Sequence, residues 1–369
     1  MYVSELLSFW KVDRNMKSTC KALLLWVGLG IMTSGAVWEM TPEDLGQYIE
    51  KKLRRNDRSL KLNEKIIHES GAKFLANSPL LESITVLKIY KGDIGDEGVR
   101  ALAQSRYLKN LKELSIENNG VTDVGARYLA ESPYLGNLET LNLFNNKIGD
   151  AGAKALAESQ TLSGLLDLNL NYNEVGDAGT LAILHSSSFK RLVHIGLAYN
   201  KLGKEGAQAL KDFRLRQKIE EWKATDSLEN LEKNYIGDRG VMILLESPYI
   251  SEIQELNLSN NNLTDEAIVA LANSSKVSKL RSLRLAGNYI TDRGAEALAK
   301  SESLGNLKNL DLNFNYIGDE GAFALAKAEH LSQLEMLRLG QNRIGFEGAR
   351  ALDQSPYLKN LIYPIFGFY

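Results

Sequence analysis

The sequence predicts an α/β solenoid in which each repeated unit contributes one short strand and one helix. Frames of the pattern L-x-x-L-x-L-x-x-N, two of them degenerate, begin at residues 57, 84, 111, 138, 165 and 192, and again at 226, 253, 280, 307 and 334. Every step is 27 residues except that from 192 to 226, which is 34. A fixed period of this size indicates units that pack on their neighbours, so 369 residues need no division into globular domains.

Two spacings within the unit distinguish the strand from the helix. Leucines two residues apart, such as Leu141 and Leu143, put both side chains on one face of a short strand. The later run at residues 153–157, A-K-A-L-A, consists of good helix formers with small side chains that allow close packing. Each unit is therefore expected to run strand, turn, helix and return.

An aspartate recurs at the start of most of the predicted helices. A single copy could hold a metal ion or stand beside a phosphate on glycine amides, but a row of copies indicates a structural role. We expect each carboxylate to cap its own helix at the positive end of the helix dipole. The glycine that follows leaves no Cβ where helix and strand approach. The predicted caps are Asp96, Asp123, Asp150, Asp177, Asp238, Asp265, Asp292 and Asp319.

An asparagine closes the strand pattern of nine units. A buried amide at this position can satisfy backbone groups of the turn that would otherwise lack hydrogen bonds. These residues are Asn119, Asn146, Asn173, Asn200, Asn234, Asn261, Asn288, Asn315 and Asn342.

These repeats make the chain resemble a leucine-rich repeat protein over residues 57–360, and the full helix in each unit resembles the ribonuclease-inhibitor-like class. The resemblance implies a curved solenoid (a horseshoe) with parallel strands on the concave face and helices on the convex face. The unit also resembles repeats common in bacterial proteins, which implies a bacterial origin. The mammalian ribonuclease inhibitor is rich in cysteine, whereas this chain has only Cys20, so the inhibitor's activity is not carried over.

Residues 1–36 predict a signal peptide or a membrane anchor. A basic start at Met16, an uncharged run over residues 22–32 and small residues before a cut after Ala36 are typical of export. The protein is then periplasmic or secreted, with Met16 as the true start. Alternatively, residues 22–38 form an uncleaved membrane anchor, and only in that case would the protein contact a membrane. A cytoplasmic location is the third possibility. Residues 37–56 predict a helix that covers the first repeat.

The predicted binding surface is the concave face, because a horseshoe leaves that face of its parallel sheet open. Large side chains from three successive units gather there beside amide groups, a combination typical of interface hot spots. The alternative is that the tyrosines only shield the strand ends. The patch consists of Asn142, Phe144, Asp167, Asn169, Asn171, Tyr172, His194 and Tyr199.

The one break in the period adds seven residues, and residues 211–225 contain the additional sequence. A partner-binding protrusion that includes Phe213 and Trp222 is favoured, because an exposed tryptophan would otherwise be a liability. A decayed repeat predicts the same pattern. The solenoid is expected to be irregular here.

The composition and motifs favour a non-catalytic module that binds a protein partner of unknown identity. A net charge of −2 argues against a nucleic-acid binder. The four histidines lie in different repeats without metal-ligand spacing, no cofactor motif appears, and no nucleophile elbow or P-loop is present. Two alternatives stay open. One is a GTPase-regulating or host-directed effector, which would need cytosolic delivery. The other is a structural surface protein that self-associates through its C-terminal edge at residues 361–369, a truncated last repeat.

Overall fold

The computed structural model describes residues 38–55, 58–363 and 365–366, which belong to two compact units divided between Lys201 and Leu202. We call these unit 1 and unit 2 and describe each by itself. The predicted signal or anchor segment at residues 1–36 lies outside the described residues. No helix within the described part of the chain is both long enough and apolar enough to cross a membrane.

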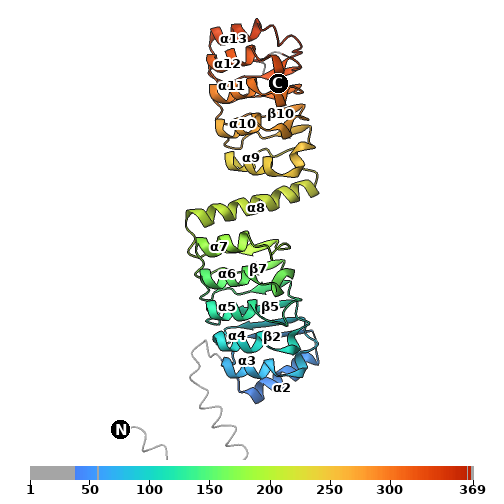
Figure 1. Cartoon of the computed structure of the whole chain (residues 1–369), viewed down its shortest axis with the longest axis vertical. Helices are drawn as coiled ribbons and strands as arrows, with labels where there is room; N and C mark the ends of the chain where they lie inside the picture. The colour runs from blue at the N-terminus through green and yellow to red at the C-terminus, as the bar shows by residue number, and fades with distance from the viewer. Residues whose placement is uncertain (1–37, 56–57, 364, 367–369) are drawn as a thin grey trace, which may run out of the picture. The chain divides into compact units, whose positions relative to one another are not determined.

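Unit 1 contains a six-stranded parallel sheet in the order β2-β4-β5-β6-β7-β8 (Figure 1). Neighbouring strands pair residues 27 positions apart, as in Leu141 with Leu168, so the register follows the sequence period. The strands of this sheet are β2 (Ser59–Asn63), β4 (Val86–Tyr90), β5 (Glu113–Glu117), β6 (Thr140–Asn142), β7 (Asp167–Asn169) and β8 (His194–Gly196). Two further strands, β1 (Trp38–Glu39) and β3 (Lys65–Ile66), pair with each other in a separate parallel sheet. The helices are α2 (Pro42–Leu53), α3 (His68–Ala76), α4 (Gly95–Ala103), α5 (Asp123–Ala130), α6 (Asp150–Glu158) and α7 (Asp177–Leu184), with 3-10 turns η1 (Pro79–Leu81), η2 (Arg106–Leu108) and η3 (Thr161–Gly164).

Unit 2 contains a four-stranded parallel sheet in the order β12-β11-β10-β9. Its strands are β9 (Glu255–Asn257), β10 (Ser282–Arg284), β11 (Asn309–Asp311) and β12 (Met336–Arg338). Its helices are α8 (Lys204–Ala224), α9 (Gly237–Glu246), α10 (Asp265–Ala272), α11 (Asp292–Lys300), α12 (Asp319–Ala326) and α13 (Phe346–Asp353). The 3-10 turns are η4 (Pro248–Ser251), η5 (Ser275–Val277), η6 (Glu302–Leu304) and η7 (Glu329–Leu331).

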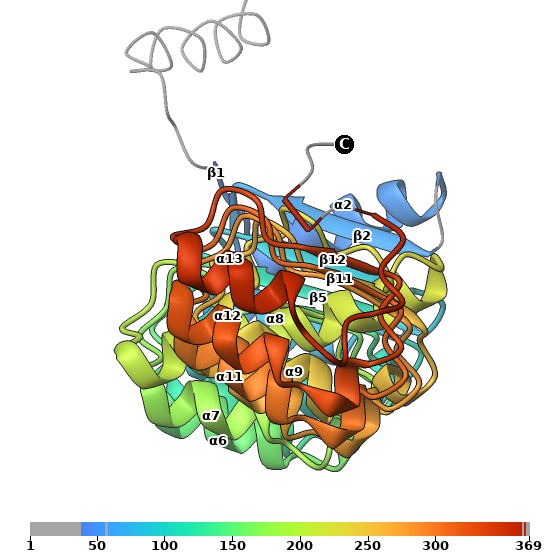
Figure 2. The ribbon, with the colours of Figure 1, turned by 90° about the horizontal axis from the view of Figure 1, so that it is seen from above.

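The core of each unit lies between the sheet and its row of helices. Figure 2 shows helices α11, α12 and α13 on one side of strands β11 and β12. Leu310 and Leu312 of β11 and Leu325 of α12 are fully buried and belong to the same hydrophobic core. The side chains that alternate with the strand leucines point the other way, where no helix covers them. We call this side of each sheet the open sheet face. This arrangement confirms the predicted α/β solenoid.

The repeated asparagines bond the turns of adjacent units, as predicted. The side chain of Asn146 is 8% exposed, and its Oδ1 accepts from the backbone N–H groups of Asn119 and Val121 in the preceding unit. Its Nδ2 donates to the carbonyls of Ile116 and Leu143. One amide thus satisfies two donors and two acceptors that the tight turns leave over.

The repeated aspartates cap the helix of the following unit, and not their own helix as the sequence analysis expects. Asp123 is the first residue of α5, yet its Oδ1 accepts from the N–H groups of Gly149 and Gly152 at the start of α6. The same pair of bonds joins five other aspartates to the next helix: Asp96, Asp150, Asp265, Asp292 and Asp319. Asp238 makes one bond of this pair, in which its Oδ1 accepts from the N–H of Thr264. The reason is geometric: the first side chain of a helix points outward, toward the neighbouring helix in the stack.

The glycine of this pattern also serves the contact between helices. A Cβ on Gly152 would lie 2.9 Å from the Cα of Asp123, a backbone atom that cannot move aside. Glycine is therefore needed where the helix passes the preceding unit's aspartate, and not where it passes the strand.

Helix α2 covers the first repeat. Thr41 caps it by accepting from the N–H of Asp44 at 3.2 Å, and Pro42 stands at the first helical position. Leu45 and Ile49 on its inner face are fully buried, so the helix contributes to the core of unit 1.

The additional sequence at residues 211–225 lengthens a regular helix and forms no exposed protrusion. Helix α8 continues from Lys204 to Ala224 and packs on α9. Trp222 is half-buried and packs against the core of unit 2, together with Ile219 and Leu215. Phe213 is also half-buried. The expectation of an exposed tryptophan is therefore wrong, because the indole covers the end of the apolar core.

Candidate functional site

The open sheet face of unit 1 brings the predicted patch together. Strands β6, β7 and β8 pair Asn142 with Asn169 and Asp167 with His194. Asp167 and Asn169 are two residues apart, so both point to the open face. Phe144, Asn171, Tyr172 and Tyr199 follow directly after these strands. All eight residues therefore lie within three neighbouring units.

The amides of Asn142 and Asn169 have a local structural role that the sequence analysis does not foresee. Each Oδ1 accepts at 3.0 Å from the backbone N–H two residues on, which belongs to Phe144 or Asn171. This is the Asx-turn bond, and strands β6 and β7 have only three residues. Strands β2, β4 and β5 carry Lys61, Lys88 and Ser115 at the same position and have five residues.

The aromatic residues of the patch form a continuous ladder, defined here as Phe144, Tyr172 and Tyr199. The ring centroids of Phe144 and Tyr172 are 5.1 Å apart, and those of Tyr172 and Tyr199 are 4.2 Å apart with nearly parallel planes. Tyr199 is nonetheless 73% exposed and Tyr172 42%. Large apolar surface thus stays accessible after the rings have stacked.

The two tyrosines have an unusual backbone conformation. Tyr172 and Tyr199 both have φ of 56°, in the left-handed region. The same position has positive φ in the other units too: four of them place Asn118, Asn145, Asn260 or Gly287 there, residue types that tolerate it, and the rest place Glu64, Lys91, Lys233, Phe314 or Gln341 there. A bulky residue there costs of order 1–3 kcal/mol, and such strain concentrates at binding and catalytic sites.

Polar groups flank the ladder. The Oδ1 of Asn171 accepts from the N–H of Ala198 at 2.7 Å, while His194 is exposed and Asp167 is half-buried. The pKa of Tyr172 is raised above its ordinary 10.0 by partial burial and then by its hydrogen bond and charge interaction with Tyr199. The phenol of Tyr172 therefore stays neutral at pH 7 and can donate a hydrogen bond.

The chemistry of this surface is that of binding. Stacked rings with exposed edges, amide groups and an imidazole provide apolar area and hydrogen bonds to a partner. Among the described residues, no group of three or more His, Cys, Asp or Glu side chains gathers in a way that could hold a metal ion.

Unit 2 exposes aromatic residues that the sequence analysis misses. Phe314 also has a left-handed backbone, with φ of 57°, and is 57% exposed. Tyr289 and Tyr316 stack with ring centroids 6.0 Å apart, and the guanidinium of Arg343 lies 4.6 Å from the Tyr316 ring. Tyr235, which has the same position in its repeat as Tyr289 and Tyr316, is 70% exposed. The sequence contains a signal for three of these aromatic residues, because tyrosine directly follows the repeated asparagine in three units, at Tyr235, Tyr289 and Tyr316.

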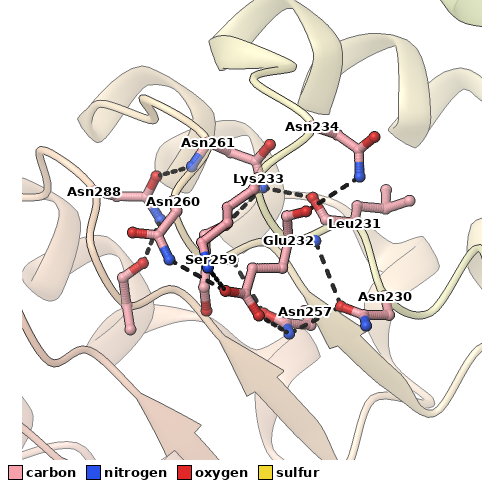
Figure 3. Close-up of polar contacts among 11 residues, drawn as sticks. Asn230, Leu231, Glu232, Lys233, Asn234, Asn257, Ser259, Asn260, Asn261 and Asn288 are labelled. Atoms are coloured by element: carbon pink, nitrogen blue, oxygen red, sulfur yellow. Dashed lines mark hydrogen bonds and ion pairs between the residues drawn. The ribbon is translucent and has the colours of Figure 1, made fainter.

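A polar cluster at the start of unit 2 surrounds Glu232. Figure 3 shows its carboxylate directed toward Lys233, Asn257 and Asn260. The Lys233 ammonium lies 3.1 Å away, and the hydrogen bond and charge of this lysine lower the pKa of Glu232 below its ordinary 4.5. Two amide groups donate to the carboxylate at 3.5 Å each. Glu232 is thus held as a fixed negative charge on the open sheet face.

Two family models match the chain within its repeats. A model described as leucine-rich repeats in two copies matches residues 109–158. A model described as a leucine-rich repeat matches residues 81–103, 165–184, 253–272, 278–299 and 306–326. The chain is a leucine-rich repeat protein, which confirms the resemblance seen in the sequence.

Comparison with solved structures finds internalins of Listeria monocytogenes. An internalin C2 is 21% identical, with 70% of this chain and 81% of that chain covered and a TM-score of 0.25. A second internalin is 18% identical, with 89% of this chain and 95% of that chain covered and a TM-score of 0.27. No curated protein matches the chain.

Proposed function

We propose that this protein is a non-catalytic recognition module that binds a protein partner through the open sheet face of unit 1. The observation that carries the proposal is the stack of Phe144, Tyr172 and Tyr199, which leaves Tyr199 73% and Tyr172 42% exposed. Stacked rings that keep so much exposed apolar area are typical of an interaction surface.

The composition of the surface supports a protein partner. Tyrosine is enriched at the energetic centres of protein interfaces, because its ring buries much area at little entropic cost and its hydroxyl can still bond. Asn171 and His194 supply a polar rim around the rings. The proposed contact residues are those of the predicted patch, with Asn142 and Asn169 serving mainly to hold the local backbone.

Site-specific photocrosslinking tests the proposal. A photoreactive phenylalanine analogue at position 199 should yield a discrete protein adduct in cells that make the chain naturally. The matched control places the same group at Lys154, an exposed residue of α6 on the helical side of unit 1. The same adducts at both positions, or none at 199, would refute binding through the open sheet face.

We propose further that the chain is exported by its first 36 residues. The test is expression in a Gram-negative host from Met1 and, separately, from Met16, followed by cell fractionation and N-terminal sequencing. A soluble periplasmic product that begins at Val37 supports export. An uncleaved product in the membrane fraction supports an anchored protein, and an uncleaved cytoplasmic product contradicts both.

Self-association through the C-terminal edge is a second candidate function. The N–H of Ile362 donates to the carbonyl of Glu335, and the N–H of Leu339 donates to that of Ile365, so Ile362 and Ile365 lie beside β12. Ile362 and Phe346 are 68% and 77% exposed at this edge. Deletion of residues 361–369 followed by measurement of the oligomer mass tests the idea, and an unchanged mass removes it.

A further inference from the structure

A groove of about 510 Å³ crosses the open sheet face of unit 2. An adjoining groove of about 260 Å³ shares two of its lining residues, Asn257 and Arg284. The small side chains of Ala286 and Gly287 leave room in the larger groove, and Phe314 also lines it. The two grooves together span the seventh to the tenth repeat of the sequence period.

Two carboxylates in the smaller groove have no cation beside them. Asp226 and Glu229 are both exposed and line the groove, and neither forms an ion pair within the described part of the chain. The other carboxylates around the grooves are paired, in that Glu232 faces Lys233, Glu255 faces Arg284 at 3.8 Å and Asp311 faces Arg338 at 3.7 Å. The uncompensated charge is therefore concentrated at one end of the combined groove.

Two largely buried serines present their hydroxyls to the grooves. Ser259 is 7% exposed and lines the larger groove, and Ser282 is 4% exposed and lines the smaller one. The backbone N–H of each is already bonded, but neither Oγ has a partner among the residues that the structure describes. Neither Oγ is itself a buried atom, so both hydroxyls are accessible from the grooves and can bond to polar groups of a ligand.

The opposite end of the combined groove is apolar. Phe314 is 57% exposed, and its left-handed backbone is the conformation already seen at Tyr172 and Tyr199. A guanidinium at Arg284 lies between the two ends and is only loosely paired with Glu255. The groove thus offers negative charge, then free hydroxyls and a donor, then an aromatic ring.

We propose that this groove binds an extended segment of a protein partner, with a lysine or arginine at Asp226 and Glu229 and an apolar side chain against Phe314. The backbone of an extended segment has N–H and C=O groups to satisfy, which matches Ser259, Ser282 and Arg284. A nucleic acid would bring phosphates to an acidic surface, and a neutral ligand would leave the two carboxylates unpaired.

Strand spacing and position along the unit fix the separation of the two anchor residues. Glu229 and Phe314 are three units apart, which gives about 14 Å across the strands, and Phe314 lies four positions further along its unit, which adds about 13 Å along the strand direction. The two residues are therefore roughly 19 Å apart, and because an extended chain advances about 3.3 Å per residue, the apolar side chain is expected about six residues from the basic one. This site belongs to unit 2 and does not depend on the aromatic ladder of unit 1.

The test uses the full chain and fluorescein-labelled synthetic peptides in an anisotropy titration. Each peptide has one arginine and one phenylalanine in a glycine–serine background, separated by about four to eight residues, and a matched set has glutamate in place of arginine. The tightest binding is expected near a separation of about six, with roughly tenfold weaker binding for the glutamate peptide. Equal binding of the two sets, or no binding below about 1 mM, overturns the proposal.

Two protein variants of equal charge change locate the binding. Glu229→Lys should weaken binding of the best peptide roughly tenfold, while Glu302→Lys, at an exposed turn outside the groove, should leave it unchanged. Phe314→Asn should weaken binding and abolish the dependence on arginine–phenylalanine separation. If the two lysine variants weaken binding equally, the effect is long-range charge alone and the groove is not the site. Circular dichroism of each variant establishes that it is folded.

Discussion

The carboxylate of Asp123 is bonded to the N–H of Gly152 in the next helix, with 2.9 Å between Oδ1 and nitrogen. The same oxygen accepts from Gly149 at 2.6 Å, so one side chain satisfies two amides at the start of α6. Stacking and helix capping are therefore one interaction in this solenoid. A helix loses its cap whenever the unit before it is displaced, which couples the stability of neighbouring units.

Removal of this carboxylate should destabilise unit 1. Asp123→Ala leaves the two amides of α6 without their acceptor, and we expect a loss of about 2 kcal/mol in the free energy of unfolding. Urea denaturation followed by circular dichroism measures the change. Glu320→Ala, at an exposed position in the first turn of α12, is the control and should change stability by less than about 0.5 kcal/mol. Equal effects of the two substitutions would contradict the role assigned to Asp123.

The asparagine ladder should reject even an isosteric acid. Asn288 accepts from two backbone N–H groups and donates to the carbonyls of Leu258 and Leu285. Asn288→Asp removes the donor and places a buried negative charge beside these carbonyls, so we expect a loss of about 3 kcal/mol at pH 7. Asn262→Asp, at an exposed left-handed position, should be nearly neutral. A small effect at Asn288 in urea denaturation would show that the ladder is not a stabilising feature.

The tyrosine ladder should be dispensable for folding. Tyr172→Asn relieves left-handed strain of order 1–3 kcal/mol and loses a stacking contact of about 0.5–1.5 kcal/mol. We therefore expect the free energy of unfolding to stay within about 1 kcal/mol of the original or to rise, while the crosslink at position 199 is lost. Asn145→Gln in the preceding unit tests whether the position itself is sensitive. A loss of more than about 3 kcal/mol for Tyr172→Asn would make the ladder a structural element.

Acid should weaken the attachment of α8 to α9. Burial acts to raise the pKa of Asp212, but hydrogen bonds from Arg239 and Gln208 outweigh it and hold the pKa below its ordinary 3.8. A depressed pKa in the folded state contributes stability that is present above the unfolded pKa and is lost as pH falls through the folded value. The stability difference between the original chain and Asp212→Asn should be constant from pH 7 to about 5 and should shrink below about 4. A difference that does not change between pH 5 and 3 would show that the ion pair with Arg239 does not contribute.

The sequence by itself determined the architecture. The period of 27, the paired leucines of each strand and the repeated asparagine all report on contacts that every unit makes in the same way. Leu141 must face the core wherever its strand lies, because side chains alternate along a strand. Asn146 can bond the turns because its amide both accepts and donates hydrogen bonds. These contacts recur from unit to unit, so the repetition of a residue along the chain is enough to infer that the contact exists.

Only the tertiary structure decided where one unit meets the next. It assigned the carboxylate of Asp123 to a neighbouring helix, placed Trp222 on the core and put left-handed backbone under Tyr172 and Tyr199. It also brought Glu229 and Phe314 to the grooves of one open sheet face. These features depend on the distance and direction between stacked units, which no spacing along the chain specifies. The repeated pattern therefore defined the scaffold, and the geometry of stacking defined the surfaces that we propose as binding sites.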